Sequence, residues 1–318
     1  MPKNVWQDLP KPIMCLAPME DVTDAAFRRI IARYGKPDVM FTEFTSADGL
    51  VSTGQDRVAR DLTFDESEHP IIAQLFTSQP EHMARAADMA QDMGFDGIDI
   101  NMGCPDRAIE KQGCGSALMK NHKLAQELIR AAQSGAPTLP ISVKTRIGYL
   151  KNELDTWLPA LLETEPAAVT LHLRTRKEMS KVPARWEEAA HAVAIRNELK
   201  SRTLILGNGD VSSLDDARTR VKETNVDGVM VGRGIYGNPW FFDATRGEIS
   251  KEEKLHVLIE HAELYEQLVS HKSFSIMKKH FKAYVHGWPG AKELRVELME
   301  ANNAAEVKNT ITAYLARI

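Results

Sequence analysis

Short apolar segments alternate with segments of helical periodicity along most of this chain. The short segments are rich in Ile, Val, Leu, Met and Phe, and several alternate apolar with polar side chains, which is typical of buried or half-buried strands. The pattern predicts strands at residues 13–17, 39–44, 71–76, 97–102, 141–146, 168–172, 204–208 and 228–232. The intervening segments have apolar residues at helical spacing and end at turn residues, as 79–93 does at Gly94.

Strands that alternate with helices over about 240 residues predict an α/β fold, and their number favours a (β/α)8 TIM barrel. An open doubly wound sheet is the alternative, but no G-x-G-x-x-G sequence follows the first predicted strand. Helical periodicity dominates after Ser250. We therefore expect a catalytic barrel at residues 1–249 and a small all-α domain at residues 250–318.

Composition narrows the class of protein. The chain has 318 residues, 43% of them hydrophobic, and a formal net charge of −4, which excludes a protein that is basic overall but allows a local basic patch. It has three cysteines, Cys15, Cys104 and Cys114, and no N-terminal apolar signal segment, so we expect a cytoplasmic protein without a disulfide framework. We also expect no membrane segment, no metal site and a monomer.

Polar and reactive side chains gather at the carboxyl ends of the predicted strands, where barrel enzymes place their chemistry. A lone cysteine beside a turn is more often a core thiol, and a lone Lys or His at a strand end is as often structural. Several of them converging on one rim predict a shared pocket instead. The residues concerned are Gln74, Asn101, Cys104, Lys144, Arg146, His172, Arg174 and Asn208.

Two glycine-containing loops follow the last two predicted strands. They read Gly207-Asn208-Gly209-Asp210 and Gly232-Arg233-Gly234. Loops at these two positions commonly bind phosphate in barrels, because glycine lets a phosphate approach backbone N–H groups and Arg233 can add a charge-assisted hydrogen bond. Tight turns without a ligand are the alternative for either loop alone. Together the loops predict a phosphorylated cofactor with a polar ring.

The same residues carry a resemblance to a known family. The chain resembles the tRNA-dihydrouridine synthase family, its bacterial B branch most closely, and the matching motifs occur in the family's order. They are Ala17-Pro18-Met19, Gln74-Leu75-Phe76, Asn101-Met102-Gly103-Cys104-Pro105, Gly115-Ser116-Ala117-Leu118-Met119, Val143-Lys144-Thr145-Arg146, His172-Leu173-Arg174-Thr175, Asn208-Gly209-Asp210, Gly232-Arg233-Gly234 and, in the helical part, Pro289-Gly290-Ala291.

The resemblance implies that the cofactor is FMN and the reductant NADPH. Ala17, Pro18 and Met19 would lie against the isoalloxazine ring, Gln74 and Lys144 would bind its polar edge, and His172 would hold the ring and ribityl region. The ribityl-phosphate end would be held by Asn208, Gly209, Asp210, Gly232 and Arg233. A lysine at the ring also makes physical sense, since reduction leaves negative charge there.

The implied reaction reduces the C5=C6 bond of a uridine in tRNA. Reduced FMN gives a hydride to C6, and Cys104 protonates C5 from the other face; an unperturbed thiol, with a pKa near 8.5, is mostly protonated at neutral pH. Asn101 would orient the uracil, while Arg146 and Arg174 would meet substrate or backbone phosphates. The uridine must leave its stack to reach a ring inside a barrel, so the RNA has to dock outside the pocket.

Two basic segments could dock the RNA. Residues 173–186 contain Arg174, Arg176, Lys177, Lys181 and Arg185 against one acid, and residues 271–286 contain Lys272, Lys278, Lys279 and Lys282 with none. Basic runs are more often solvated faces, but their places beside the pocket and in the helical domain favour phosphate binding. The chain departs from the family pattern at Glu20-Asp21, Thr77, Leu173 and residues 179–183, which bears on the shape of the substrate mouth.

Three other functions stay open at this point. A flavin barrel could act on a free pyrimidine or another small molecule, although the basic helical domain argues against it. A non-flavin aldolase could use Lys144 as a Schiff base. An RNA-binding protein without catalysis is the third alternative.

Overall fold

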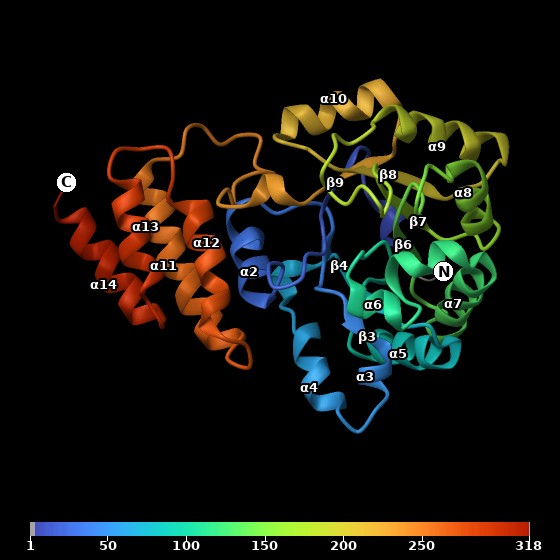
Figure 1. Ribbon diagram of the computed structural model, residues 1–318, viewed down its shortest axis with the longest axis horizontal. Helices are drawn as coiled ribbons and strands as arrows, with labels where there is room; N and C mark the ends of the chain where they lie inside the picture. Colours follow the sequence, from blue (N-terminus) through green and yellow to red (C-terminus); the bar gives the residue numbers. More distant parts are fainter. Residues whose placement is uncertain (1–3, 318) are drawn as a thin grey trace.

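The computed structural model describes residues 4–317 and contains a parallel β-barrel beside a bundle of helices (Figure 1). The barrel is a nine-stranded sheet in the order β1-β9-β8-β7-β6-β5-β4-β2, with β3 paired to β4. A parallel bridge between Cys15 and Val39 brings the two ends of this order together. The strands are β1 Ile13–Leu16, β2 Met40–Phe41, β3 Thr45–Ser46, β4 Ile71–Phe76, β5 Gly97–Met102, β6 Ile141–Arg146, β7 Ala168–His172, β8 Leu204–Asn208 and β9 Gly228–Val231.

The barrel prediction is confirmed, and one strand differs from its expected form. The segment 39–44, expected as a single strand, is regular only at β2, and β3 follows after a break. At this break the backbone N–H of Gln74 on β4 donates to the Thr42 side-chain hydroxyl at 3.1 Å. Because a side chain satisfies this strand donor in place of a backbone carbonyl, the β2–β4 ladder is interrupted there.

Helices cover the outside of the barrel and form the C-terminal bundle. Most of the barrel helices follow a strand, as expected for (β/α) units. The α-helices are α1 Val5–Asp8, α2 Ala25–Tyr34, α3 Ala47–Leu50, α4 Gln55–Ala59, α5 Pro80–Asp92, α6 Arg107–Lys111, α7 His122–Gly135, α8 Leu154–Leu162, α9 Glu187–Glu198, α10 Leu214–Thr224, α11 Lys251–Leu268, α12 Met277–Tyr284, α13 Ala291–Met299 and α14 Ala304–Leu315. Short 3-10 helices lie at η1 Arg60–Leu62, η2 Glu66–Glu68, η3 Gly115–Lys120, η4 Arg233–Ile235 and η5 Phe274–Ile276.

The alternation of β5 separates two environments. Ile98 and Ile100 belong to the apolar cluster between the strands and the surrounding helices. Asp99 and Asn101 take the other face, and their hydrogen bonds run to side chains of the neighbouring strands. Below this polar layer the barrel interior is apolar, and Trp6 of α1 packs there with its ring centroid 6.3 Å from that of Phe41. The polar layer therefore lies between this apolar floor and the carboxyl ends of the strands.

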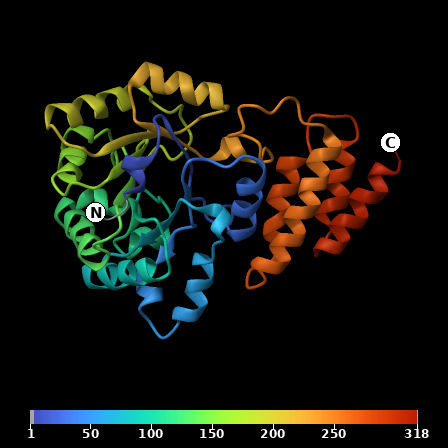
Figure 2. The same ribbon diagram turned by 180° about the vertical axis from the view of Figure 1, so that it is seen from behind.

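The helical bundle packs on one side of the barrel (Figure 2). Its first helix, α11, begins after Ser250, whose side chain caps the helix by accepting from the N–H of Glu253. The apolar core of the bundle also includes Ala26 and Ile30 of α2 and Trp240 of the barrel. The division at residues 249 and 250 remains a prediction, because this core crosses it.

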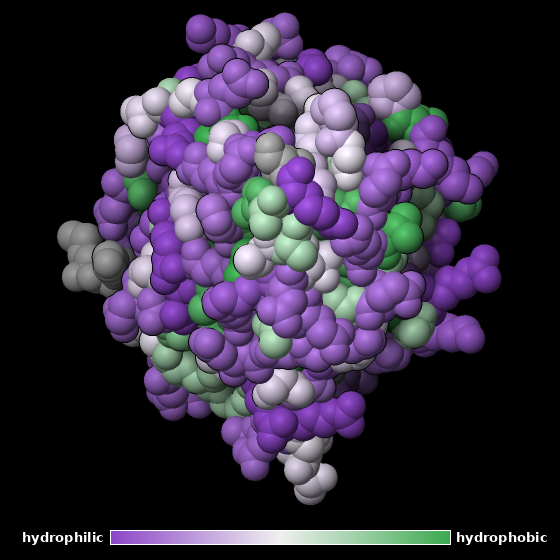
Figure 3. Space-filling view, turned by 90° about the vertical axis from the view of Figure 1, so that its left-hand side faces the viewer, coloured by the Kyte–Doolittle hydropathy of each residue, from purple (hydrophilic) through white to green (hydrophobic). Residues whose placement is uncertain are grey.

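The outer face of the bundle is mostly hydrophilic, with small separate apolar patches (Figure 3). Val296 and Met299 of α13 are exposed apolar side chains of the bundle. Within residues 4–317, no helix combines the length and the apolar character needed to cross a membrane.

Candidate active site

A cavity of about 530 Å³ opens at the carboxyl ends of the barrel strands. Its volume falls in the range of about 300–1,000 Å³ that small-molecule and cofactor sites occupy. Ten of the eleven residues predicted to bind the cofactor line it, and Gln74 is the exception. The complete lining is Ala17, Pro18, Met19, Lys144, Arg146, His172, Arg174, Ser180, Asn208, Gly209, Asp210, Val211, Ser212, Met230, Gly232, Arg233 and Gly234.

A smaller cavity of about 160 Å³ adjoins the first and shares Pro18, Lys144 and Arg146 with it. Cys104, the predicted proton donor, lies on this smaller cavity. The remaining lining residues are Phe44, Gln74, Asn101, Gly103 and Pro105. Most of the predicted cofactor residues thus line the larger cavity, whereas Asn101 and Cys104 line the smaller one, and Lys144 lies on both.

Strand register brings these side chains together. Directly paired residues of neighbouring strands present their side chains to the same face of a sheet. Asn101 pairs with Lys144, and further round the barrel Arg146 pairs with His172 and His172 with Asn208. The sequence predicted that these side chains gather at the strand ends, and the register between strands sets which of them become neighbours.

Cys104 is held by its backbone from two directions. Its N–H donates to Asn101 Oδ1 at 2.9 Å, and its carbonyl accepts the N–H of Ser116 at 2.9 Å. Gly115 has φ +59°, and a Cβ at that position would lie 2.7 Å from the Cys104 carbonyl oxygen. Only glycine fits this approach, so the segment around Gly115 packs directly on the backbone of Cys104.

Burial shifts the pKa values of the ionisable groups of the site. Desolvation raises the pKa of the Cys104 thiol, which keeps it protonated at neutral pH. Burial lowers the pKa of Lys144 to about 8, with Arg146 adding to the shift and Asp99 opposing it. Burial also lowers the pKa of His172 well below its ordinary value, so its imidazole is neutral. The site therefore holds a protonated thiol and a cationic ammonium at pH 7.

An acid and two arginines form a cluster at the loop after β8. Asp210 has φ +52°, and its carboxylate accepts from Arg174 and, at 3.1 Å, from Arg233. Arg174 is almost fully buried and also lies 3.1 Å from His172 Nε2, whereas the Arg233 side chain is 63% exposed. Arg233 is thus the cation of this cluster that a ligand phosphate could reach from solvent. Gly209 has φ +132°, and a Cβ there would lie 2.8 Å from Ala184 Cβ and 3.3 Å from the His172 ring, so glycine is required at this position.

The other arginines predicted to bind substrate have protein partners. Arg146 donates to the backbone carbonyls of Gly103, at 2.8 Å, and Met179, at 3.0 Å. Arg176 pairs with Glu110 and is partly exposed. These contacts tie together the loops after β5, β6 and β7, and the predicted role of the arginines in phosphate binding stays a prediction.

The predicted docking residues of the helical domain lie on α12. Lys279 and Lys282 are exposed and Lys278 is partly exposed. Lys272, from the same basic run, differs from them: its ammonium lies 2.9 Å from Glu43 Oε2 and 3.5 Å from Asp61 Oδ1. Lys272 therefore belongs to an ion-pair cluster between the barrel and the helical bundle, and the open basic face consists of the α12 lysines.

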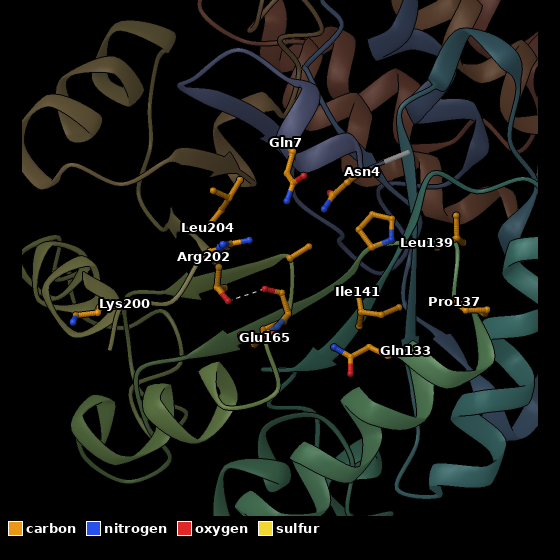
Figure 4. A pocket seen from close by; sticks show the side chains of 15 residues that line it. Asn4, Gln7, Gln133, Pro137, Leu139, Ile141, Glu165, Lys200, Arg202 and Leu204 are labelled. Atoms are coloured by element: carbon orange, nitrogen blue, oxygen red, sulfur yellow. Dashed lines mark hydrogen bonds between the residues drawn. The ribbon is translucent and has the colours of Figure 1, made fainter. Parts of the chain in front are cut away.

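A separate cavity of about 640 Å³ lies at the opposite, amino-terminal end of the strands (Figure 4). It is lined by the starts of β6 and β8 and by polar side chains that include Gln133, Glu165 and Arg202. None of the predicted site residues lies there. Within the described part of the chain there is also no cluster of three or more His, Cys, Asp or Glu residues that could hold a metal ion.

Asp99 and Ser142 are members of the polar layer that the site predictions did not include. Asp99 accepts from Gln74 Nε2 and from the Ser142 hydroxyl, both at 2.7 Å. The sequence signal was present in the alternation of Asp99 and Asn101 with two isoleucines. Ser180, Ser212 and Val211, which line the larger cavity, had no such signal, because loops place them.

Solved structures share the barrel. A 2-naphthoyl-CoA reductase complex superposes with a TM-score of 0.58 at 11% identity, covering 76% of this chain and 51% of that one. Histamine dehydrogenase from Rhizobium sp. 4-9 superposes with a TM-score of 0.55 at 13% identity, covering 79% and 48%. The chain thus spans about half the length of each of these two proteins, and at such identities the likeness shows the fold alone.

Sequence comparison identifies the family. A "Probable tRNA-dihydrouridine synthase" of Staphylococcus epidermidis is 39% identical over 322 residues, covering 100% of this chain and 98% of the relative. A "Probable tRNA-dihydrouridine synthase 2" of Bacillus subtilis is 40% identical over 312 residues, covering 97% and 95%. The profile of the family described as "Dihydrouridine synthase (Dus)" matches residues 15–318. The chain therefore belongs to the dihydrouridine synthase family of oxidoreductases.

Proposed function

We propose that this protein reduces the C5=C6 bond of uridines in tRNA, with FMN as its cofactor and NADPH as its reductant. The observation that carries the proposal is the pair of adjoining cavities that share Lys144, one with a glycine-lined anion site and the other with the Cys104 thiol. Membership of the dihydrouridine synthase family supports the substrate. When bound, FMN would take two electrons from NADPH and supply a hydride to C6 of the uracil.

The residues of the larger cavity fit FMN. Arg233 and the backbone around Gly209 suit its phosphate, and the Lys144 ammonium would stabilise the negative charge that reduction places on the ring system. The neutral His172 would bind the ring and ribityl region without adding a further positive charge. The full predicted set is Ala17, Pro18, Met19, Gln74, Lys144, His172, Asn208, Gly209, Asp210, Gly232 and Arg233.

Cys104 would complete the reduction. Its thiol transfers a proton to C5 of the uracil, which balances the hydride at C6, and the thiolate then regains a proton from solvent. The raised pKa of the thiol favours the protonated form that this step needs. Asn101 lines the same cavity and would orient the uracil edge.

The helical domain would bind the body of the tRNA. The exposed face of α12 carries Lys278, Lys279 and Lys282, and these are free to meet phosphates. At the pocket itself Arg146, Arg174 and Arg176 would shape the mouth, and of these Arg176 is the one open enough for a direct phosphate contact.

Purified protein and a Cys104→Ala variant test the proposal. We expect both to be yellow, because Cys104 lies on the smaller cavity, and we expect the variant to form dihydrouridine in tRNA about 10² to 10⁴ times more slowly. Cys114→Ala is the matched control, since Cys114 is buried outside both cavities. A colourless protein, full activity of Cys104→Ala, or equal turnover of free uridine would each overturn the proposal.

A further inference from the structure

A chain of buried hydrogen bonds runs through the polar layer beneath the site. It starts at Asp99 of β5, which is fully buried. One oxygen of its carboxylate accepts from the Ser142 hydroxyl of β6 at 2.7 Å, and the other accepts from Gln74 Nε2 of β4 at 2.7 Å. Asp99 therefore bridges the two strands that flank its own.

The chain continues upward to Cys104. Gln74 Oε1 accepts from Asn101 Nδ2 at 3.1 Å. Asn101 Oδ1 in turn accepts the backbone N–H groups of Gly103, at 3.1 Å, and Cys104, at 2.9 Å. A buried carboxylate at one end is thus connected to the backbone of the predicted proton donor at the other.

The two ends of this chain dictate the orientation of both amides. An ionised carboxylate can only accept, so Gln74 must turn its NH2 group to Asp99 and its oxygen to Asn101. A backbone N–H can only donate, so Asn101 must turn its oxygen to Gly103 and Cys104 and its NH2 group to Gln74. Both requirements give the same arrangement, and reversing either amide would leave buried groups unpaired.

The orientation of the Gln74 amide also determines whether this side chain presents a hydrogen-bond donor or an acceptor to a ligand. Gln74 uses one of its two N–H groups on Asp99, and the second stays available at the smaller cavity. The side chain therefore presents a donor there, which suits a carbonyl or a ring nitrogen acceptor.

We propose that Asp99 is a positioning residue: its carboxylate sets the orientation of the Gln74 and Asn101 amides, and through them the backbone at Cys104 and the donor that the pocket presents. Only the identity of the ring bound there rests on the proposed function. The hydrogen bonds themselves are a property of the protein without a ligand.

The first test uses no cofactor. The rate of Cys104 alkylation by iodoacetamide, followed by mass spectrometry of its peptide, reports how firmly the segment is held, since Cys15 and Cys114 are buried. Asp99→Leu removes the acceptor, and we expect alkylation to speed up by about fivefold or more, as an unpaired buried amide favours local opening. Asp99→Asn keeps an acceptor for Gln74, with its NH2 group facing the Ser142 hydroxyl, and should stay within about threefold of the parent protein.

Asp96→Leu is the matched control for stability. Asp96 accepts the N–H of Ile71 at 2.8 Å at the other end of the barrel, so its loss weakens the fold without touching the chain to Cys104. Equal alkylation rates in Asp99→Leu and Asp96→Leu would overturn the inference. If Cys104 of Asp99→Asn is alkylated more than about threefold faster than in the parent protein, the charge of Asp99 and not the orientation of the amides is what matters. That result would also overturn the inference.

The second test measures FMN binding and the visible absorption of bound FMN. We expect Asp99→Leu to bind FMN about tenfold more weakly with an altered spectrum, while Asp99→Asn and Asp96→Leu keep both. If the parent protein binds no FMN, the proposed function fails while the alkylation test still decides the role of Asp99. If FMN binds equally to every variant and alkylation is unchanged, the role of Asp99 fails while the proposed function stands.

Discussion

Lys272 Nζ lies 2.9 Å from Glu43 Oε2, so a lysine of the helical domain pairs with a carboxylate at the carboxyl end of the barrel. The same ammonium lies 3.7 Å from Asp21, whose backbone, at φ +55°, donates its N–H to Glu43. Asp21 and Glu43 follow the first two strands. Asp21 comes two residues after Met19, which lines the larger cavity, and Glu43 directly precedes Phe44, which lines the smaller one. The contact between the helical bundle and the barrel is therefore made by the same two loops that contribute to the rim of the pocket.

Replacing Lys272 should weaken this junction. Lys272→Met leaves clustered carboxylates without their cation, and because the lysine is 20% exposed we expect a loss of about 1–2 kcal/mol in the free energy of unfolding, measured by urea denaturation. Lys292→Met, at an exposed position on α13, should change it by less than about 0.5 kcal/mol. Equal effects of the two variants would contradict a structural role for the Lys272 cluster.

The α12 lysines should govern the salt dependence of tRNA binding. For each of Lys278, Lys279 and Lys282 replaced by Gln, we expect the slope of log affinity against log salt to fall by about 0.7–0.9, because one fewer counterion is released. Filter binding at several salt concentrations measures the slope. Lys292→Gln serves as the control on a neighbouring helix, and an unchanged slope in the triple variant would place the RNA elsewhere.

Two buried histidines should make the domain junction sensitive to acid. His261 of α11 and His280 of α12 lie with ring centroids 4.6 Å apart, and neither ring has a hydrogen-bond partner among the described residues. Burial lowers the pKa of His261 to about 3 and that of His280 well below its ordinary value. Below about pH 6.5 these two histidines are protonated in the unfolded chain but stay neutral in the folded chain. The free energy of unfolding therefore falls as the pH drops from about 6.5 towards 3.

The histidine effect should be at most about 1.4 kcal/mol per pH unit for each ring. Thermal melting at several pH values measures it, and the double variant His261→Gln, His280→Gln should show a weaker loss of stability in acid. His256→Gln, an exposed position on α11, should keep the parent slope. An identical acid profile in the double variant would show that other groups set this dependence.

Lys144 should raise the reduction potential of a bound flavin. Its ammonium stabilises negative charge in the pocket, so Lys144→Met is expected to lower the midpoint potential at pH 7 by about 30–60 mV, as read by dye-coupled spectroscopic titration. Since burial lowers the pKa of Lys144 to about 8, the lysine is cationic below that pH and neutral above it. The difference between the two proteins should therefore shrink as the pH rises past about 8.

Lys144→Arg, which keeps a cation, is the control for this measurement. Its potential should stay closer to that of the parent protein, and the gap to Lys144→Met should persist above pH 8 because arginine does not lose its proton there. A potential that is equal in all three proteins would remove Lys144 from the control of the flavin.

The local sequence pattern was sufficient to predict most strands of the barrel. Each regular strand spans only a few residues, and its side-chain alternation depends on nearest neighbours, so β6, β7 and β8 have the predicted bounds. The prediction of one continuous strand at residues 39–44 was wrong. The strand breaks where the backbone N–H of Gln74, some thirty residues away in the sequence, donates to the Thr42 hydroxyl. A pattern within one segment contains no information about such a partner.

The candidate site divides in the same way. The sequence by itself determined which residues stand at the strand ends, since strand period and chain order are local, and so it named Cys104 and Lys144. Only the tertiary structure decided which partners the polar side chains have. Asp99 accepts a hydrogen bond from the Gln74 amide, Arg174 pairs with Asp210, and Lys272 pairs with Glu43 of the barrel. Hydrogen bonds and ion pairs depend on distances between strands and loops, and those distances exist only once the barrel has closed.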